Sequence, residues 1–141
     1  MTMLSPLAAA IAELAADPAV SAITTRIRPV ETSAGDSLGA GSYQPFVVVS
    51  TLDAPWHGGT ATSAVFLGLR CYAATYPAAE ALALACAAVF HRRGGRIAAS
   101  RLGIYSSRVE GGPQLDKDPA TGQPLAHLTA TLNTSIQPIP A

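Results

Sequence analysis

Three histidines and two cysteines are the side chains of this 141-residue chain best suited to hold a metal or to act as nucleophiles. The histidines, His57, His91 and His127, fall on different predicted elements, and their spacing does not match that of zinc ligands. Cys71 and Cys86 lie in apolar sequence, whereas a reactive cysteine needs neighbours that lower the pKa of its thiol. We therefore expect no catalytic residue, metal ion or cofactor here, and two buried free thiols that can lie side by side.

The segment Asp116–Gly122 (DKDPATG) contains the acidic residues of a calcium-binding loop but not its pattern. Pro119 follows Asp118 directly, and no glutamate closes the segment as a bidentate ligand, so we predict a hairpin turn. The chain also lacks the motifs of serine hydrolases, zinc proteases and nucleotide-binding enzymes. The sequence therefore favours a protein that is not an enzyme.

Two other features are candidates for contact with another protein. Trp56 is predicted at the tip of a turn, where it either folds back on the core or meets a partner. Arg92 and Arg93, with Arg96 close behind, form a basic cluster at the end of a predicted helix. Solvation of a helix end is sufficient to explain the cluster, and an acidic partner surface is the alternative.

Composition limits the function further. Hydrophobic residues make up 49% of the chain, charged residues only 13%, and the formal net charge is zero. This balance argues against a basic nucleic-acid-binding surface and against long disorder. So little charge also suits a protein that buries surface in an assembly. We find neither a signal-peptide pattern nor an apolar stretch long enough to cross a membrane, so no membrane partner is expected.

The elements that position these residues are organised around the segment Ala64–Arg93, which predicts a strand, a tight connection and a long helix. Strand alternation gives two different faces. The apolar face consists of Val65, Leu67, Leu69, Cys71 and Ala73. The other face carries Phe66, Arg70 and Tyr72, a mixture of aromatic and charged side chains that suits a partner-facing surface.

The helix is predicted over Ala78–Arg93, because apolar residues recur there at helical spacing and Gly94–Gly95 can end it. Its apolar stripe consists of Leu82, Cys86, Val89 and Phe90. We expect this stripe to cover the apolar face of the strand. The most buried residues of the resulting core should include Leu69, Leu82, Phe90 and Leu128.

A first helix is predicted between Ser5–Pro6 and Asp17–Pro18, and a flexible loop rich in glycine and serine over Glu31–Gln44. The remaining β segments are predicted at Ile23–Arg28, Phe46–Leu52, Leu102–Val109 and Leu125–Ile136, with a turn-rich stretch at Glu110–Pro124. This order predicts one domain, residues 1–141, of the α+β class. It should be a two-layer sandwich, with a mostly antiparallel sheet and two helices packed on one face.

The pattern as a whole resembles the tail terminator (tail-completion, head-tail joining) proteins of long-tailed bacteriophages. The resemblance covers nearly the whole chain and depends on the order and spacing of its parts. After the opening helix, the matching stretches are DPAVSAITTRIRP (17–29), PFVVVST (45–51), AVFLGLRCYAATYPAAEALALACAAV (64–89) and EGGPQLDKDPATGQPLAHLTATL (110–132).

The resemblance implies an α+β subunit of a homo-oligomeric ring, typically a hexamer, at the tail-neck junction of the virion. Such a ring forms in the host cytoplasm, caps the finished tail tube and stops its elongation. Its partners would be further copies of itself, the tail tube protein and the head-side connector or stopper protein, and DNA would only pass through its lumen. It implies no cofactor. The candidate interface residues are Trp56, Phe66, Arg70, Tyr72, Arg92 and Arg93.

Three other functions stay open at this stage. The chain can be another neck component, such as a head-closure or connector protein, which ring size and docking partner would distinguish. It can be a small-molecule binding module, which should be monomeric and have a preformed apolar pocket. An enzyme is the third alternative, but no sequence feature supplies a general base beside a nucleophile.

Overall fold

The computed structural model describes residues 6–29, 44–53, 62–91, 93–97, 102–119 and 121–135. Within these ranges the chain forms the helices α1 (Pro6–Ala16), α2 (Pro18–Ser21) and α3 (Tyr76–Phe90). The strands are β1 (Ile27–Arg28), β2 (Phe46–Asp53), β3 (Thr62–Tyr72), β4 (Arg93–Ile97), β5 (Leu102–Lys117) and β6 (Pro124–Ser135). The loop predicted over residues 31–44 lies outside the described residues except for Gln44.

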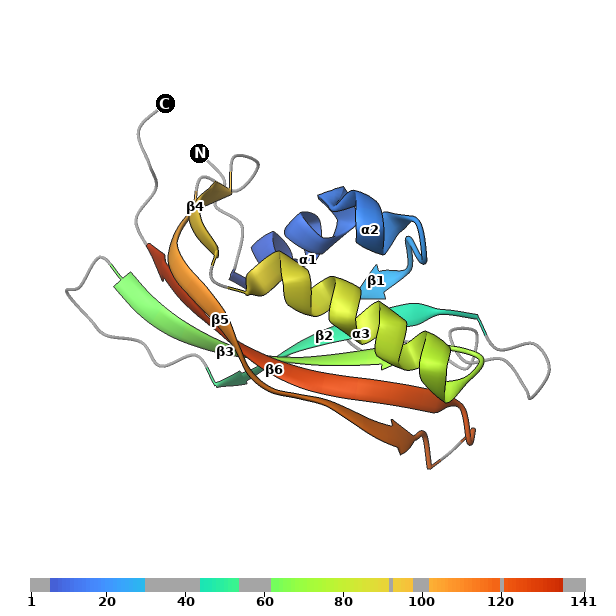
Figure 1. Ribbon diagram of the computed structural model, residues 1–141. Coiled ribbons are helices and arrows are strands. Elements are labelled where there is room, and N and C mark those ends of the chain that lie inside the picture. The colour runs from blue at the N-terminus through green and yellow to red at the C-terminus, as the bar shows by residue number, and fades with distance from the viewer. Residues whose placement is uncertain are drawn as a thin grey trace.

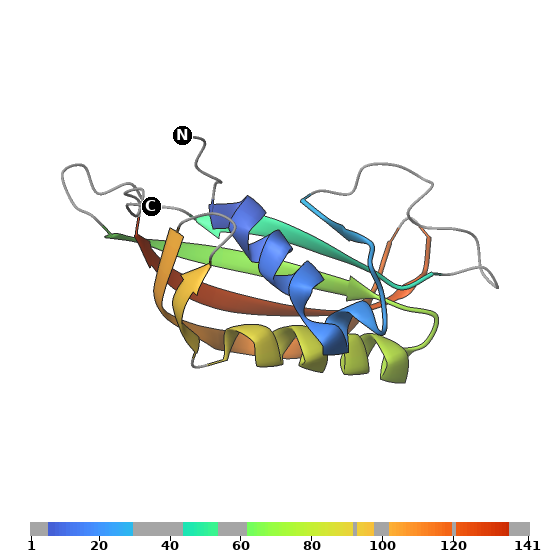
Figure 2. The same ribbon diagram turned by 90° about the horizontal axis from the view of Figure 1, so that it is seen from above.

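The domain has two layers, a sheet and a group of helices that lies on one of its faces (Figure 1). The strand order is β1-β2-β3-β6-β5-β4; β1 pairs with β2 in parallel, and every other neighbouring pair is antiparallel. Seen from above, α1 and α3 cross the sheet at an angle to each other (Figure 2). The predicted α+β sandwich with a mostly antiparallel sheet is therefore confirmed, with the single turn α2 as an additional helix.

Helix α3 forms where local signals and the apolar pattern agree. Thr75 caps its N-terminus, because the Thr75 hydroxyl accepts a hydrogen bond from the Ala78 backbone N–H at 3.3 Å. Pro77 lies in the first turn, where a missing N–H costs no hydrogen bond. The predicted stripe is buried, together with two alanines: Ala79, Leu82, Ala83, Cys86, Val89 and Phe90.

The core lies between this stripe and the helix-covered face of β2, β3 and β6. Leu69, Leu82 and Phe90 have no exposed surface and Leu128 is 1% exposed, so the predicted core residues are confirmed. Burial of such aliphatic and aromatic side chains is the main stabilising contribution to a domain of this size.

The two cysteines are free and buried, as predicted, and they lie in contact. A hydrogen bond with Cys86 and burial both raise the pKa of the Cys71 thiol. Cys71 faces the helices from β3, and Cys86 faces the sheet from α3, so the pair spans the two layers.

Two predicted boundaries are wrong. Helix α3 ends at Phe90 rather than Arg93, and Gly94–Gly95 belong to the strand β4 instead of a loop. The last turn of α3 is fixed by a tertiary contact, because the buried Ser107 hydroxyl donates to the Phe90 carbonyl at 2.6 Å. Pairing of β4 with β5 then outweighs the helical tendency of the basic segment.

Strand β5 is longer than predicted. It continues beyond Val109 through the glycine-rich stretch to Lys117, where we predicted turns. Register shifts between Val109 and Gly111, and between Gly111 and Gln114, let the strand bulge and still pair with β6. Gly112 has φ of 102°, a conformation that favours glycine.

Candidate interaction surface

The face of the sheet opposite the helices, here called the open face, carries the predicted interface residues that can be placed. Phe66 and Arg70 both point to it from β3, as strand alternation requires. Arg70 lies directly across from His127 of β6, and His127 lies across from Gln114 of β5. The open face therefore combines side chains from segments far apart in the sequence.

Phe66 is 37% exposed and is one of the large apolar side chains that reach the described surface. It lies in one row with Thr131 and Arg108. Both of these polar neighbours bond to Glu110: the Arg108 Nε lies 2.6 Å and the Thr131 hydroxyl 2.9 Å from its Oε1. The hydrogen bonds from Arg108 and Thr131 lower the pKa of the Glu110 carboxyl, which keeps it ionised.

Tyr72 was predicted to be accessible on the partner-facing side of β3, and this prediction is wrong. Its ring stacks on that of Phe46, with centroids 4.2 Å apart, and it is only 1% exposed. Val48 and Leu125 complete this second small cluster, and the Arg26 guanidinium lies 5.4 Å from the centroid of Phe46. The neighbouring strands thus cover this end of the open face, and Tyr72 contributes to stability rather than to an accessible surface.

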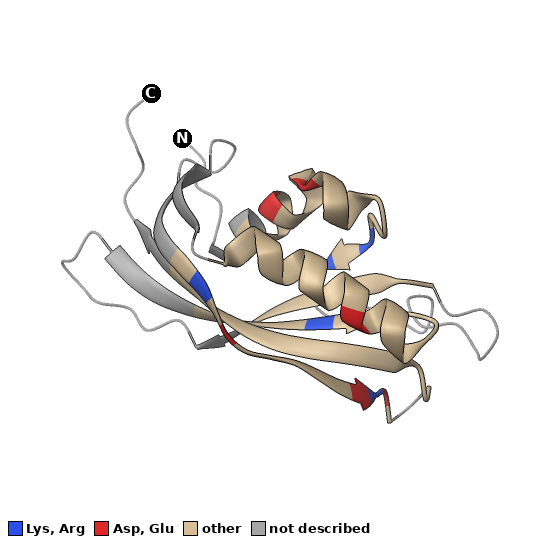
Figure 3. Ribbon diagram, viewed as in Figure 1, with Lys and Arg blue, Asp and Glu red and all other residues tan. Residues whose placement is uncertain are grey.

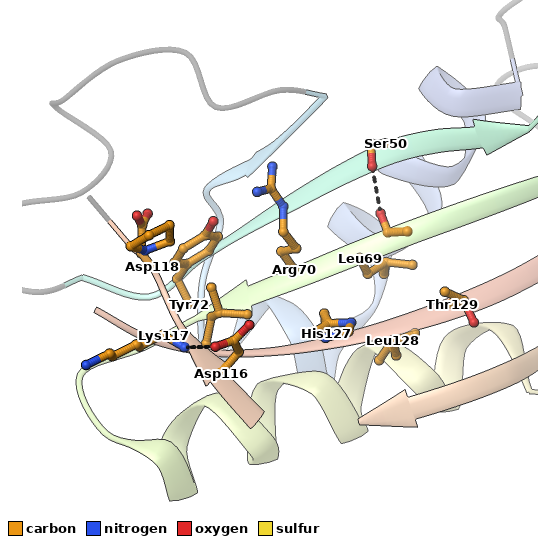
Figure 4. Close-up of a pocket in the computed structure, with 13 residues that line it drawn as sticks. Ser50, Leu69, Arg70, Tyr72, Asp116, Lys117, Asp118, His127, Leu128 and Thr129 are labelled. Carbon is orange, nitrogen blue, oxygen red and sulfur yellow. Dashed lines mark hydrogen bonds between the residues drawn. The ribbon is translucent and has the colours of Figure 1, made fainter. Parts of the chain in front are cut away.

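A hollow of about 650 Å³ lies on the open face between this cluster and the end of β5 (Figure 4). Its lining comes from β2, β3, β5, β6 and the turn after β5. The lining residues are Ser50, Gly68, Leu69, Arg70, Tyr72, Asp116, Lys117, Asp118, Pro119, Leu125, His127, Leu128 and Thr129. Arg70 and His127 lie toward its middle, with the acidic and basic residues of β5 at one end (Figure 4). The hollow therefore combines charged groups of both signs with apolar side chains such as Tyr72 and Leu125.

The chemistry available in the hollow is limited. The Ser50 hydroxyl donates to the Gly68 carbonyl at 3.4 Å and not to His127, so these two do not form a nucleophile–base pair. Among the residues that the structure describes, no group of three or more His, Cys, Asp and Glu could hold a metal ion. Cys71 lies in the core, outside the hollow, and its raised pKa disfavours the thiolate form that a nucleophile requires.

The remaining candidates lie elsewhere. Trp56 and Arg92 fall outside the described residues, and of Arg93 only the backbone, as the first residue of β4, is described. Their role at an interface stays a prediction. The turn predicted near Asp118 is confirmed: the Asp118 N–H donates to the Gln123 carbonyl at 2.9 Å, and this turn connects β5 to β6.

The sequence did not single out His127, Ser50 or Thr129 as neighbours of Arg70. Strand alternation alone puts His127 on the face of β6 opposite Ala126 and Leu128, which is the face that it occupies. Only the register between β3 and β6 shows that it lies beside Arg70, and register depends on contacts across the whole sheet.

Charged residues are sparse over the described chain (Figure 3). The helical segments 6–21 and 76–90 contain only Glu13, Asp17 and Glu80 as charged residues. The open face carries both signs, with Arg70 and Asp116 at the hollow and Arg108 bonded to Glu110. No described helix has the length and apolar character that a membrane span requires. No family model matches the chain, and a search of curated proteins finds no match to it.

Proposed function

We propose that this chain is the subunit of a ring that caps a bacteriophage tail tube, stops its elongation and joins it to the head-side connector. The proposal rests on the resemblance of the whole chain to tail terminator proteins, whose expected α+β fold is the fold observed. In this function the protein is a structural component of the virion and not an enzyme. Its partners are other copies of itself, the tail tube protein and the connector.

The observation that best supports a structural function is the one-sided sandwich. The three described helices lie on one face of the sheet, and the other face presents Phe66, Arg70 and a shallow hollow (Figures 1 and 4). Exposed aromatic and arginine side chains are typical of protein interfaces. The open face is therefore the surface that we assign to the tube or the connector.

The direct experiment adds the purified protein to growing tubes of the tail tube protein encoded near it. Electron microscopy should show a ring at one end of each tube, and the tube length should then stay constant. Phe66→Ala should reduce capping at limiting protein concentration, because it removes an exposed ring from the open face. Leu84→Ala is the matched control, since Leu84 is 53% exposed on the helical layer.

Tubes that continue to lengthen, with no added density at either tip, would exclude the terminator function. They would leave the other neck functions, which docking to the connector alone would reveal. Genes for the tail tube and tape-measure proteins in the neighbourhood would support any of these neck functions.

The hollow favours a second candidate, a small-molecule binding module. Its volume of about 650 Å³ falls in the range of ligand pockets, and Arg70 and His127 suit an anionic group. A bound ligand would raise the midpoint of thermal unfolding of the monomer, and Arg70→Gln would reduce that increase. The same ligand should then leave tube length unchanged, which distinguishes the two functions.

A further inference from the structure

The two sides of the sheet have stepped edges. On one side, β1 pairs with β2 only at Val47 and Val48. Beyond this point, in the described part of the chain, no strand lies beside the rest of β2, Val49–Asp53. Among the described residues, this side therefore has a short added strand at one end and an uncovered edge at the other.

The opposite side has the reverse shape. Strand β4 pairs with β5 along Leu102–Ser107, and no described strand lies beside Arg108–Lys117 on that side. Because β2 and β5 run in opposite directions, β1 lies near one end of the sheet and β4 near the other. The two edges are thus complementary in outline.

The backbone of β2 presents hydrogen-bonding groups at its uncovered edge. The Val47 N–H donates to the Arg26 carbonyl at 2.9 Å, so odd-numbered residues of β2 direct their N–H and C=O toward the β1 side. Val49 and Thr51 therefore direct theirs into the uncovered space, while Ser50 is directed at β3. An open row of this kind is a ready template for pairing with another strand.

The same reasoning applies to β5. The Pro124 carbonyl accepts from the Ala73 N–H, so even-numbered residues of β6 direct their backbone groups toward the β3 side. Val109 of β5 lies across from Ala130 and therefore directs its own backbone groups away from β6. Both edges thus offer donors and acceptors at the positions where a neighbouring strand is missing from the described chain.

We propose that copies of this chain join edge to edge, with β4 of one copy pairing with Val49–Asp53 of the next. In the same junction, β1 of the second copy lies beside Arg108 and Val109 of the first. The inference rests on the ring-forming part of the proposed function and names the surfaces that form the ring. Each junction is heterologous, because two different edges meet, and repetition about an axis closes a ring.

The lengths and directions of the strands support this junction. Strand β4 has five residues, which matches the uncovered stretch Val49–Asp53. If adjacent sheets keep the same orientation, β4 runs parallel to β2 and β1 runs antiparallel to β5. Strands β1 and β4 then occupy, end to end, a single strand position between the two copies.

The register gives the required offset. Arg93 lies in one row with Ser107, Leu132 and Val65, whereas Val49 lies in the row of Leu69. Four residues of β3 separate these rows, so the second copy is offset along the strands by about 13 Å at about 3.3 Å per residue. Each copy in such a ring spans roughly five strand positions of about 4.8 Å each. An offset of about 13 Å over that width corresponds to a strand tilt of about 30°, close to that of closed β-barrels.

Hydrogen exchange at single-residue resolution tests the junction in the wild-type protein. On assembly, the amides of Val49, Thr51 and Val109 should become protected by at least about tenfold, because they gain strand partners. The amide of Ser50 is the internal control, since it is bonded to β3 in the free subunit. Rings or caps in which none of the three outward amides gains protection would overturn the proposal and leave the terminator function intact.

A proline at the uncovered edge provides an independent test. Thr51→Pro removes an N–H that faces outward, so it should leave the pairing of β2 with β3 intact and reduce assembly at least about tenfold. Thr51→Ala keeps the N–H and should assemble like the wild type. A folded Thr51→Pro protein that assembles normally would contradict the junction. Should Thr51→Pro fail to fold, the exchange experiment decides.

The outcomes separate the two proposals. A ring with protected edge amides that does not cap tubes would support the junction and exclude the terminator function. A protein that stays monomeric at high concentration and in the presence of tubes would exclude both. Protection restricted to residues of the open face would show that copies meet through that face instead.

Discussion

Replacement of Gly112 by alanine tests the account of the β5 bulge. Gly112 has φ of +102°, and a Cβ atom added there would lie 2.6 Å from the His127 carbonyl oxygen and 2.8 Å from both Leu128 Cα and Leu128 Cβ. Backbone atoms of the paired strand β6 cannot move aside in the way that a flexible side-chain end can. The substitution must therefore change either the bulge or the pairing of β5 with β6.

The expected cost follows from these two effects. An L-residue in a sparsely populated backbone region costs about 1–3 kcal/mol, and overpacking of a close contact costs about 1–3 kcal/mol. Gly112→Ala should thus lower the free energy of unfolding by about 2–6 kcal/mol. This is a large fraction of the about 5–15 kcal/mol that stabilises a typical domain.

Gly111→Ala is the matched control. A Cβ atom at Gly111 would meet only the Thr129 hydroxyl oxygen, at an ordinary distance of 3.5 Å, and no positive φ is involved. Its effect should stay within about 0.5 kcal/mol. Urea unfolding of the two variants and the wild type, followed by circular dichroism, gives the comparison. Equal stability of the two variants would show that the bulge is not built as described.

Three further predictions concern the core, the thiols and the open face. Leu82→Ala should lower the free energy of unfolding by about 2–5 kcal/mol, while Leu84→Ala, at an exposed position of the same helix, should cost far less; equal urea midpoints would contradict the assigned helix face. Cys71 and Cys86 should react with iodoacetamide only after unfolding, as mass spectrometry would show, because both are buried and the Cys71 pKa is raised. Because the pKa of Glu110 is lowered in the folded state, the stabilising effect of its carboxylate is complete above the pKa that Glu110 has in the unfolded chain. The effect is lost as the pH falls through the folded-state pKa. The urea midpoints of the wild type and Glu110→Gln should therefore differ at neutral pH and converge in acid.

Elements whose local pattern agrees with their tertiary environment could be predicted from the sequence. In β6, alternation puts Ala126, Leu128, Ala130 and Leu132 on one face, and this face is buried, because a strand with one covered face requires apolar residues at every second position. The stripe of α3 was readable for the same reason at helical spacing. Contact between Cys71 and Cys86 followed from laying that stripe on the apolar face of β3.

Features that depend on strands far apart in the chain could not be predicted in this way. Strand β4 has no apolar alternation of its own and forms because β5 is available to pair with it. Gly111 and Gly112 read as a turn, but pairing with β6 on both sides of them turns the same residues into a bulge within β5. Tyr72 is buried because Phe46 of the adjacent strand stacks on it. Strand order, register and such cross-strand contacts are cooperative properties of the whole sheet, so no local pattern specifies them.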